Sequence, residues 1–107
     1  MKALIVSRLG LHTRIIEELR KYEVSEFEDY FAERNEWRNV NDIEEAAKEK
    51  GCEAVVLIAN FKAALELLAR GFKRIFVITP KYYTLTEIVT GELYVIEGSV
   101  KAIAKSV

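Results

Sequence analysis

The sequence predicts a single α/β domain in which a mainly parallel, open sheet carries helices on both faces and a β-hairpin ends the chain. Two segments, "AVVLIA" (54–59) and "IFVIT" (75–79), are apolar almost throughout, as strands covered on both faces are. One helix-length segment joins them, which is the pattern of a parallel crossover unit. A length of 107 residues suits one domain, so we treat residues 1–107 as a unit.

The chain begins with a strand and a helix. The apolar run "KALIVS" (2–7) predicts a buried strand. A helix is expected from Thr13 to about Tyr22, with Thr13 as its cap, because apolar residues recur there at helical spacing. The stripe consists of Ile15, Ile16 and Leu19.

The next two elements are a short strand and a surface helix. The aromatic content of "VSEFEDYF" (24–31) favours a strand. In "DIEEAAKEKG" (42–51) a narrow apolar face indicates a helix that Asn41 or Asp42 caps and Gly51 ends. That face consists of Ile43, Ala46 and Ala47.

The second half repeats the alternation and then changes. "FKAALELLARG" (61–71) predicts a helix that starts after Asn60 and stops at Gly71, with Phe61, Ala64, Leu65 and Leu68 as its buried stripe. After Pro80, the runs "ELYVIE" (92–97) and "VKAIAKS" (100–106) are expected to form a hairpin through Gly98 and Ser99. The whole pattern is of the general Rossmann-like kind.

Composition narrows the function classes. The net charge of −1, with half the residues apolar, argues against a disordered chain and against a protein that coats long nucleic acids. No apolar run reaches the roughly 20 residues of a membrane helix, and "MKALIVSRLG" lacks an export signal, so we expect a cytoplasmic protein without membrane contact. The absence of glutamine, with abundant charge, is typical of thermophile proteins.

Metal and disulfide chemistry are not expected. Cys52 is the single cysteine, which excludes an internal disulfide, and we expect it to be a small buried residue ahead of a strand. One cysteine and one histidine do not make a zinc site, and no other metal-ligand spacing is present. We therefore expect neither a metal nor a cofactor.

Three loops should meet at the edge formed by the carboxyl ends of parallel strands, where ligands bind in such folds. They are "SRLGLHT" (7–13), "NFK" (60–62) and "TPKYY" (79–83). Two of them lead into helix amino termini, whose free N–H groups attract phosphate. The candidate ligand-binding residues are Ser7, Arg8, Gly10, Leu11, His12, Thr13, Asn60, Phe61, Lys62, Thr79, Lys81 and Tyr82.

These residue types suit a nucleotide. Arg8, Lys62 and Lys81 supply positive charge, while Phe61 and Tyr82 offer rings on which a base can stack. A simpler interpretation stays open, since basic residues at helix starts are often only solvated and aromatic residues after strands often belong to the core. His12 can move a proton near neutral pH, or it can be an ordinary surface residue. No GxGxxG or P-loop pattern occurs.

A five-residue stretch, "GLHTR" (10–14), resembles the phosphohistidine motif of the histidine-containing phosphocarrier proteins of bacterial sugar uptake. The proline expected next in that motif is replaced by Ile15. The strand–helix–strand pattern of residues 54–79 also departs from that family's antiparallel sheet. We therefore disfavour phosphocarrier activity and retain only the idea of phosphate at a helix start.

A broader resemblance covers most of the chain. A first strand ending in "SR", a loop with glycine and histidine, "VVLIANFKAALELLARGFKRIFVIT" and a late "TGEL" resemble the small single-domain CRISPR-associated proteins with a CARF-type fold. Several of these are stand-alone ring nucleases, which bind and cut cyclic oligoadenylate and so switch off type III CRISPR signalling. The resemblance implies a homodimer with the ligand across its two-fold axis. Ser7, Arg8 and His12 would then meet the ligand backbone, and the cradle would be completed by Asn60, Lys62, Thr79 and Lys81.

The implied reaction is attack of a ribose 2′-hydroxyl on its neighbouring phosphodiester without a metal. Arg8 or Lys81 would stabilise charge on the phosphoryl oxygens, and His12 would move a proton. Two alternatives fit the same sequence: a sensor that binds without cutting, and an interaction subunit that docks a partner through an apolar helix face or the hairpin. A nuclease for ordinary RNA is disfavoured, because no extended basic stripe is present.

Overall fold

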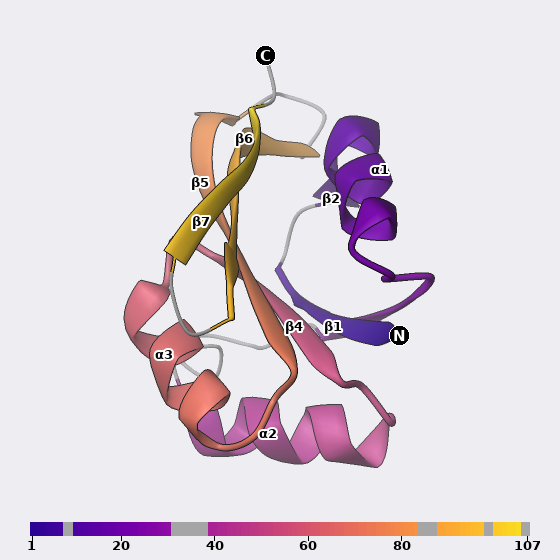
Figure 1. The fold of residues 1–107 in the computed structure, drawn as a ribbon, viewed down its shortest axis with the longest axis vertical. Helices are drawn as coiled ribbons and strands as arrows, with labels where there is room; N and C mark the ends of the chain where they lie inside the picture. The colour runs from indigo at the N-terminus through magenta and orange to yellow at the C-terminus, as the bar shows by residue number, and fades with distance from the viewer. Residues whose placement is uncertain (8–9, 31–38, 84–87, 98–99, 106–107) are drawn as a thin grey trace.

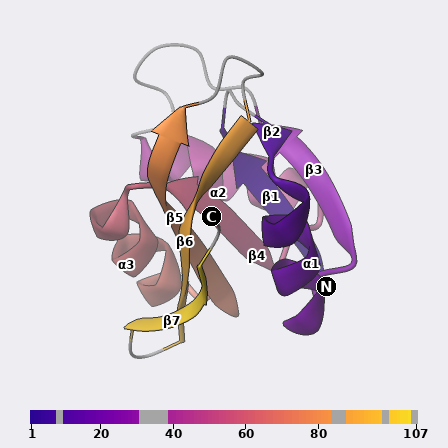
Figure 2. The ribbon, with the colours of Figure 1, turned by 90° about the horizontal axis from the view of Figure 1, so that it is seen from above.

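The computed structural model describes residues 1–7, 10–30, 39–83, 88–97 and 100–105. For residues 80–83, 88–90 and 100–105 the description covers the backbone alone. The two ribbon views show one sheet with helices on either side of it (Figures 1 and 2).

Within the described residues, a seven-stranded sheet and three helices form the domain. The helices are α1 (Thr13–Lys21), α2 (Val40–Glu49) and α3 (Phe61–Ala69). The strands are β1 (Lys2–Val6), β2 (Gly10–Leu11), β3 (Glu26–Tyr30), β4 (Ala54–Ile58), β5 (Arg74–Tyr83), β6 (Ile88–Ile96) and β7 (Val100–Lys105). Their order is β2-β6-β5-β4-β1-β3, and β7 also pairs with β6.

The strand directions confirm the predicted class. β3, β1, β4 and β5 are neighbours and run parallel, and along the chain α1 lies between β1 and β3, α2 between β3 and β4, and α3 between β4 and β5. β6 is antiparallel to β5, and β7 is antiparallel to β6, so the predicted hairpin is present. The chain is therefore a small Rossmann-like domain with an antiparallel end.

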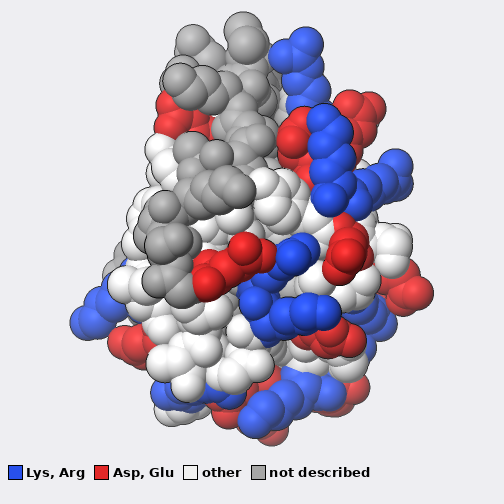
Figure 3. All heavy atoms as spheres, in the orientation of Figure 1, with Lys and Arg blue, Asp and Glu red and all other residues white. Residues whose placement is uncertain are grey.

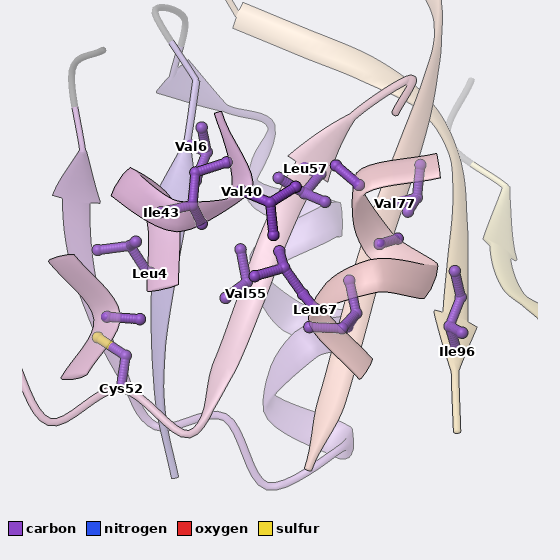
Figure 4. Close-up of a cluster of buried hydrophobic side chains, with 14 residues drawn as sticks. Leu4, Val6, Val40, Ile43, Cys52, Val55, Leu57, Leu67, Val77 and Ile96 are labelled. Carbon is purple, nitrogen blue, oxygen red and sulfur yellow. The ribbon is translucent and has the colours of Figure 1, made fainter. Parts of the chain in front are cut away.

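Each face of the sheet has its own core. On one face, Ile15 and Leu19 of α1 pack against the side chains of Ala3, Ile5 and Phe76. On the other face, α2 and α3 cover the sheet, and Figure 4 shows their side chains pointing toward those of the strands. This second cluster contains Leu4, Val6, Val40, Ile43, Cys52, Val55, Leu57, Leu67, Val77 and Ile96. Cys52 is buried as expected, and burial raises the pKa of its thiol.

Two of the predicted helix caps are wrong. His12, and not Thr13, precedes α1, and its side chain accepts a hydrogen bond from the amide of Arg14. Asn39 caps α2, two residues before Asn41, because Val40 is buried and so extends the helix by part of a turn. For α3, Asn60 is the cap.

The predicted buried stripe of α3 is also wrong in part. Leu65 is 54% exposed, whereas Ala63, Ala64 and Leu67 are buried. Phe61 and Leu68 lie at the margin of the core. The reason is that the helix packs against the sheet and α2 together, which turns Ala63 and Ala64 toward the strands and leaves Leu65 on the outer side.

The expected loop "TPKYY" is strand. β5 continues through Pro80 to Tyr83, and β6 begins earlier than expected, at Ile88. Pro80 lies opposite Gly91, and the register shifts between Pro80 and Tyr82. Because β4 ends its pairing at Ile78, Pro80 stands where β5 has β6 alone as a neighbour, a position that tolerates a residue without an N–H group.

Truncation of two leucines in α3 tests this packing. We expect Leu67→Ala to lower the free energy of unfolding by about 2–5 kcal/mol, because it removes buried methyl groups and leaves a cavity. Leu65→Ala, on the same helix, should change it by less than about 1 kcal/mol because that side chain is largely in water already. Urea denaturation of both variants measures the difference, and equal losses would contradict the packing.

Candidate functional site

The strand order reverses between β1 and β4, and this reversal defines the candidate site. From β1 the chain proceeds to α1 on one face, and from β4 it proceeds to α3 on the other face. The two connections therefore diverge above the carboxyl ends of neighbouring strands. In open α/β sheets this divergence leaves the crevice in which ligands bind. Ser7 follows β1 and Asn60 follows β4, so both lie at this position.

The turn from β4 into α3 is tightly held. Ala59 adopts a left-handed backbone conformation with φ of 53°, which costs a non-glycine residue on the order of 1 kcal/mol. Its amide donates a 2.8 Å hydrogen bond to the carbonyl of Ile78 on β5. The side-chain oxygen of Asn60 accepts from the amide of Ala63 at 3.1 Å. These contacts aim the first turn of α3 at the crevice.

That first turn offers donors for an anion. The amides of Phe61 and Lys62 precede the first residues that bond within the helix, so they have no intrahelical acceptor. Lys62 is exposed and makes no ion pair with the residues that the structure describes. The helix dipole and this lysine together favour negative charge here.

β5 and β6 continue beyond the end of β4 and form a wall beside the crevice. The pairing from Thr79 with Glu92 to Tyr83 with Val89 lies past the last residue pair of β4 and β5. β2 then pairs with the start of β6. These strands can be followed from above in Figure 2.

The wall curves toward β1. β1 and β2 are four positions apart in the sheet, which is about 19 Å in a flat sheet at ~4.8 Å per strand. Gly10 comes only four residues after Val6, and four residues span at most about 14 Å. The sheet must therefore bend so that β2 and the start of α1 approach the crevice.

His12 stands at that approach. Its Nδ1 atom accepts the amide hydrogen of Arg14 at 3.1 Å, which assigns the ring proton of the neutral form to Nε2. The side chain is half-buried. The histidine is thus a helix cap with one nitrogen, while its other nitrogen is a hydrogen-bond donor.

A polar cluster beside α3 was missed by sequence reasoning. On the α3 side of the wall, the hydroxyl of Tyr94 donates to a carboxylate oxygen of Glu92, and the ring of Tyr94 contacts Phe61 edge-on with 5.5 Å between centroids. The hydroxyl of Thr79 lies 3.5 Å from the carbonyl of Glu92. Hydrogen bonding to Glu92 raises the pKa of Tyr94, so the phenol stays a donor. The signal available was the alternation of "ELYVIE", which puts Glu92 and Tyr94 on one face.

The predicted site residues fall into three groups. One group surrounds the carboxyl ends of β1, β4 and the adjoining part of β5: Ser7, Asn60, Phe61, Lys62 and Thr79. A second group lies along β2 and the start of α1: Gly10, Leu11, His12 and Thr13. Lys81 and Tyr82 belong to the wall, where their backbone is described, and Arg8 lies outside the described residues.

Positive and negative side chains alternate over the face drawn in Figure 3. Many of the cations are paired with a carboxylate, as in Lys2 with Glu28 and Lys21 with Glu18. In the part of the chain that the structure describes, no three histidine, cysteine or acidic side chains form a group able to hold a metal ion. No helix within the described residues has the length and apolar character needed to cross a membrane.

Two substitutions of His12 separate its capping role from its chemistry. His12→Ala removes the acceptor for the Arg14 amide and should lower the free energy of unfolding by about 1 kcal/mol. His12→Asn supplies a preferred cap, so it should be at least as stable as the natural chain. Thermal or urea denaturation measures both. If the asparagine variant is as unstable as the alanine variant, His12 is not acting as a cap.

The chain matches no protein-family model, no curated protein and no solved structure.

Proposed function

We propose that the chain binds a cyclic oligoadenylate across a homodimer and cleaves it without a metal. The observation that carries this proposal is the reversal of strand order between β1 and β4, with the open first turn of α3 aimed at the crevice. A nucleotide phosphate is the ligand that such a position accommodates best. The resemblance to CARF-type ring nucleases adds the ring form of the ligand and the dimer.

The size of the domain supports a shared ligand. The molecule measures 32 × 29 × 24 Å, and its crevice is bounded on one side by a single wall of β5 and β6. Two copies related by a two-fold axis would present two such crevices to one ring, each taking equivalent phosphates. The amides of Phe61 and Lys62, with the Lys62 ammonium, are the described groups that would hold them.

The reaction needs no outside nucleophile. A ribose 2′-oxygen attacks the adjacent phosphorus, the bond from phosphorus to the 5′-oxygen breaks, and a 2′,3′-cyclic phosphate end results. The 2′-hydroxyl releases its proton to water. The protonated form of His12 is assigned the donation from Nε2 to the 5′-oxygen, which returns the ring to the neutral form that caps α1, while Arg8 and Lys81 are assigned the charge on the phosphoryl oxygens. Ser7 and Thr79 would position the phosphodiester backbone of the ligand.

The direct test is incubation of the purified protein with cyclic tetra-adenylate in EDTA, followed by chromatography. We expect linear products ending in a cyclic phosphate, and a dimer in analytical ultracentrifugation. Intact ligand after long incubation would show that the protein does not cleave it. Calorimetry on the same samples then distinguishes the remaining alternatives: binding without cleavage indicates a sensor, and no binding favours an interaction subunit.

Matched lysines test the location of the site. Lys62→Ala should weaken ligand binding about fivefold to tenfold, because it removes one charge-assisted phosphate contact at an exposed position. Lys73 is also exposed but precedes β5 at the opposite edge of the sheet, so Lys73→Ala should bind normally. Equal effects of the two substitutions would mean that the ligand does not bind at the α3 end.

His12→Asn tests the proposed proton transfer, because it preserves the helix cap. We expect binding to be retained and the cleavage rate to fall by about 100-fold, the usual contribution of a positioned acid. Unchanged cleavage by this variant would exclude His12 as the proton donor.

A further inference from the structure

The outer edge of the sheet at β3 is open. Among the described strands, β3 pairs with β1 alone, and Figure 2 shows it at the side of the sheet with no labelled element beyond it. The pairing is regular along its whole length, from Lys2 with Glu26 to Val6 with Tyr30. Within the described part of the chain, the backbone of residues 26–29 bonds to β1 and to no other segment. The N–H and C=O groups on its outer side are therefore available to an added strand.

The strand at the opposite end of the sheet, β7, is protected in a way that β3 is not. The pairing of β7 with β6 contains a register shift, and its sequence includes Lys101 and Lys105. Bulges and lysines are common means by which proteins prevent an edge strand from pairing with another chain. The sequence of β3, "EFEDY", contains neither lysine nor proline, and its register does not shift. This contrast indicates that the β3 edge is left accessible.

The side chains along this edge are mainly acidic. Glu28 is already paired, with Lys2 at 2.9 Å and with Lys50 at 3.9 Å. Glu26 and Asp29 are exposed, and neither forms an ion pair with a described residue. These two carboxylates are therefore the charges that an added strand would meet.

The charges decide which kind of strand can be added. Pairing of β3 with β3 of a second copy sets carboxylates opposite carboxylates, and like charges directly opposite each other destabilise a sheet. Lysine or arginine opposite Glu26 and Asp29 would instead form two cross-strand ion pairs. Phe27 lies between them at the margin of the core on the α1 side, so an apolar residue opposite it would extend that core. The edge thus favours a basic partner strand and disfavours self-association.

We propose that the outer edge of β3 binds an extended segment of a partner protein as an added strand. The segment has basic residues opposite Glu26 and Asp29 and an apolar residue opposite Phe27. Backbone hydrogen bonds supply affinity in this mode of recognition, and the side chains supply selectivity. β3 and β4 lie on opposite sides of β1, so this edge is separate from the crevice between β1 and β4. The inference is therefore independent of the proposed function.

The probe is a short capped peptide in which lysine, valine, valine and lysine follow one another within a threonine background. Its order is symmetric, so it presents the same side chains in parallel and in antiparallel addition. We expect fluorescence anisotropy to show binding to the full chain. A peptide with glutamate in place of both lysines should bind about tenfold more weakly, because two attractive pairs become repulsive. N-methylation of both valine amides should also weaken binding about tenfold, because it removes strand hydrogen bonds and no charge.

Charge reversal in the protein tests the location. The double variant Glu26→Lys with Asp29→Lys should bind the glutamate peptide more tightly than the lysine peptide. The matched control, Glu17→Lys with Glu66→Lys, changes the net charge equally at exposed positions on α1 and α3, so it should still prefer the lysine peptide. Circular dichroism confirms that both variants fold.

Four outcomes would overturn the inference. They are no binding of the lysine peptide to the natural chain, equal binding of its N-methylated form, an unchanged preference in the double variant at β3, and a reversed preference in the control variant. The last outcome would mean that overall charge, and not the β3 edge, governs binding.

Discussion

The handedness of the chain crossings is the constraint on which this molecule depends. Crossovers between parallel strands are right-handed, so a chain that adds β3 on one side of β1 and β4 on the other has to place its helices on opposite faces. The crevice between β1 and β4 is a consequence of that rule and needs no dedicated residues. What the residues decide is the charge that this position carries, and Lys62 with the amides of Phe61 and Lys62 contributes positive potential there.

The core and the rim, which is the sheet edge at the carboxyl ends of β1 and β4, belong to the same elements but have different energetic roles. Below the rim, Leu57 and Val77 are buried side by side in the sheet, where apolar burial provides the stability. At the rim the structure accepts an unfavourable feature, the left-handed backbone of Ala59. Local strain of this kind persists only where the surrounding structure enforces it, and it is commonest at functional sites.

At the opposite edge of the sheet, Arg74 is a charged residue with a structural role. Arg74 at the start of β5 donates to the carbonyl of Tyr22 at 2.7 Å, stands 5.6 Å from the centre of that ring and pairs with Glu97. All its partners belong to the protein, and they join α1, β5 and the end of β6. Lys62 at the rim contrasts with this arrangement, because none of the described residues pairs with it. A cation without an internal partner is free to meet a ligand.

Local pattern alone determined most of the elements, although it missed β2, which lies in an expected loop. Continuous apolar runs marked β1, β4 and β5, helical spacing marked α1, and two short runs marked β6 and β7, on either side of Gly98 and Ser99, which lie outside the described residues. Tertiary structure decided the rest. Which side of α3 is buried depended on its packing against α2, and the extension of β5 through Pro80 depended on β6 as a partner. Glu92 and Tyr94 joined the site because antiparallel pairing set them beside α3, and pairing between distant segments leaves no mark in the residues of either one.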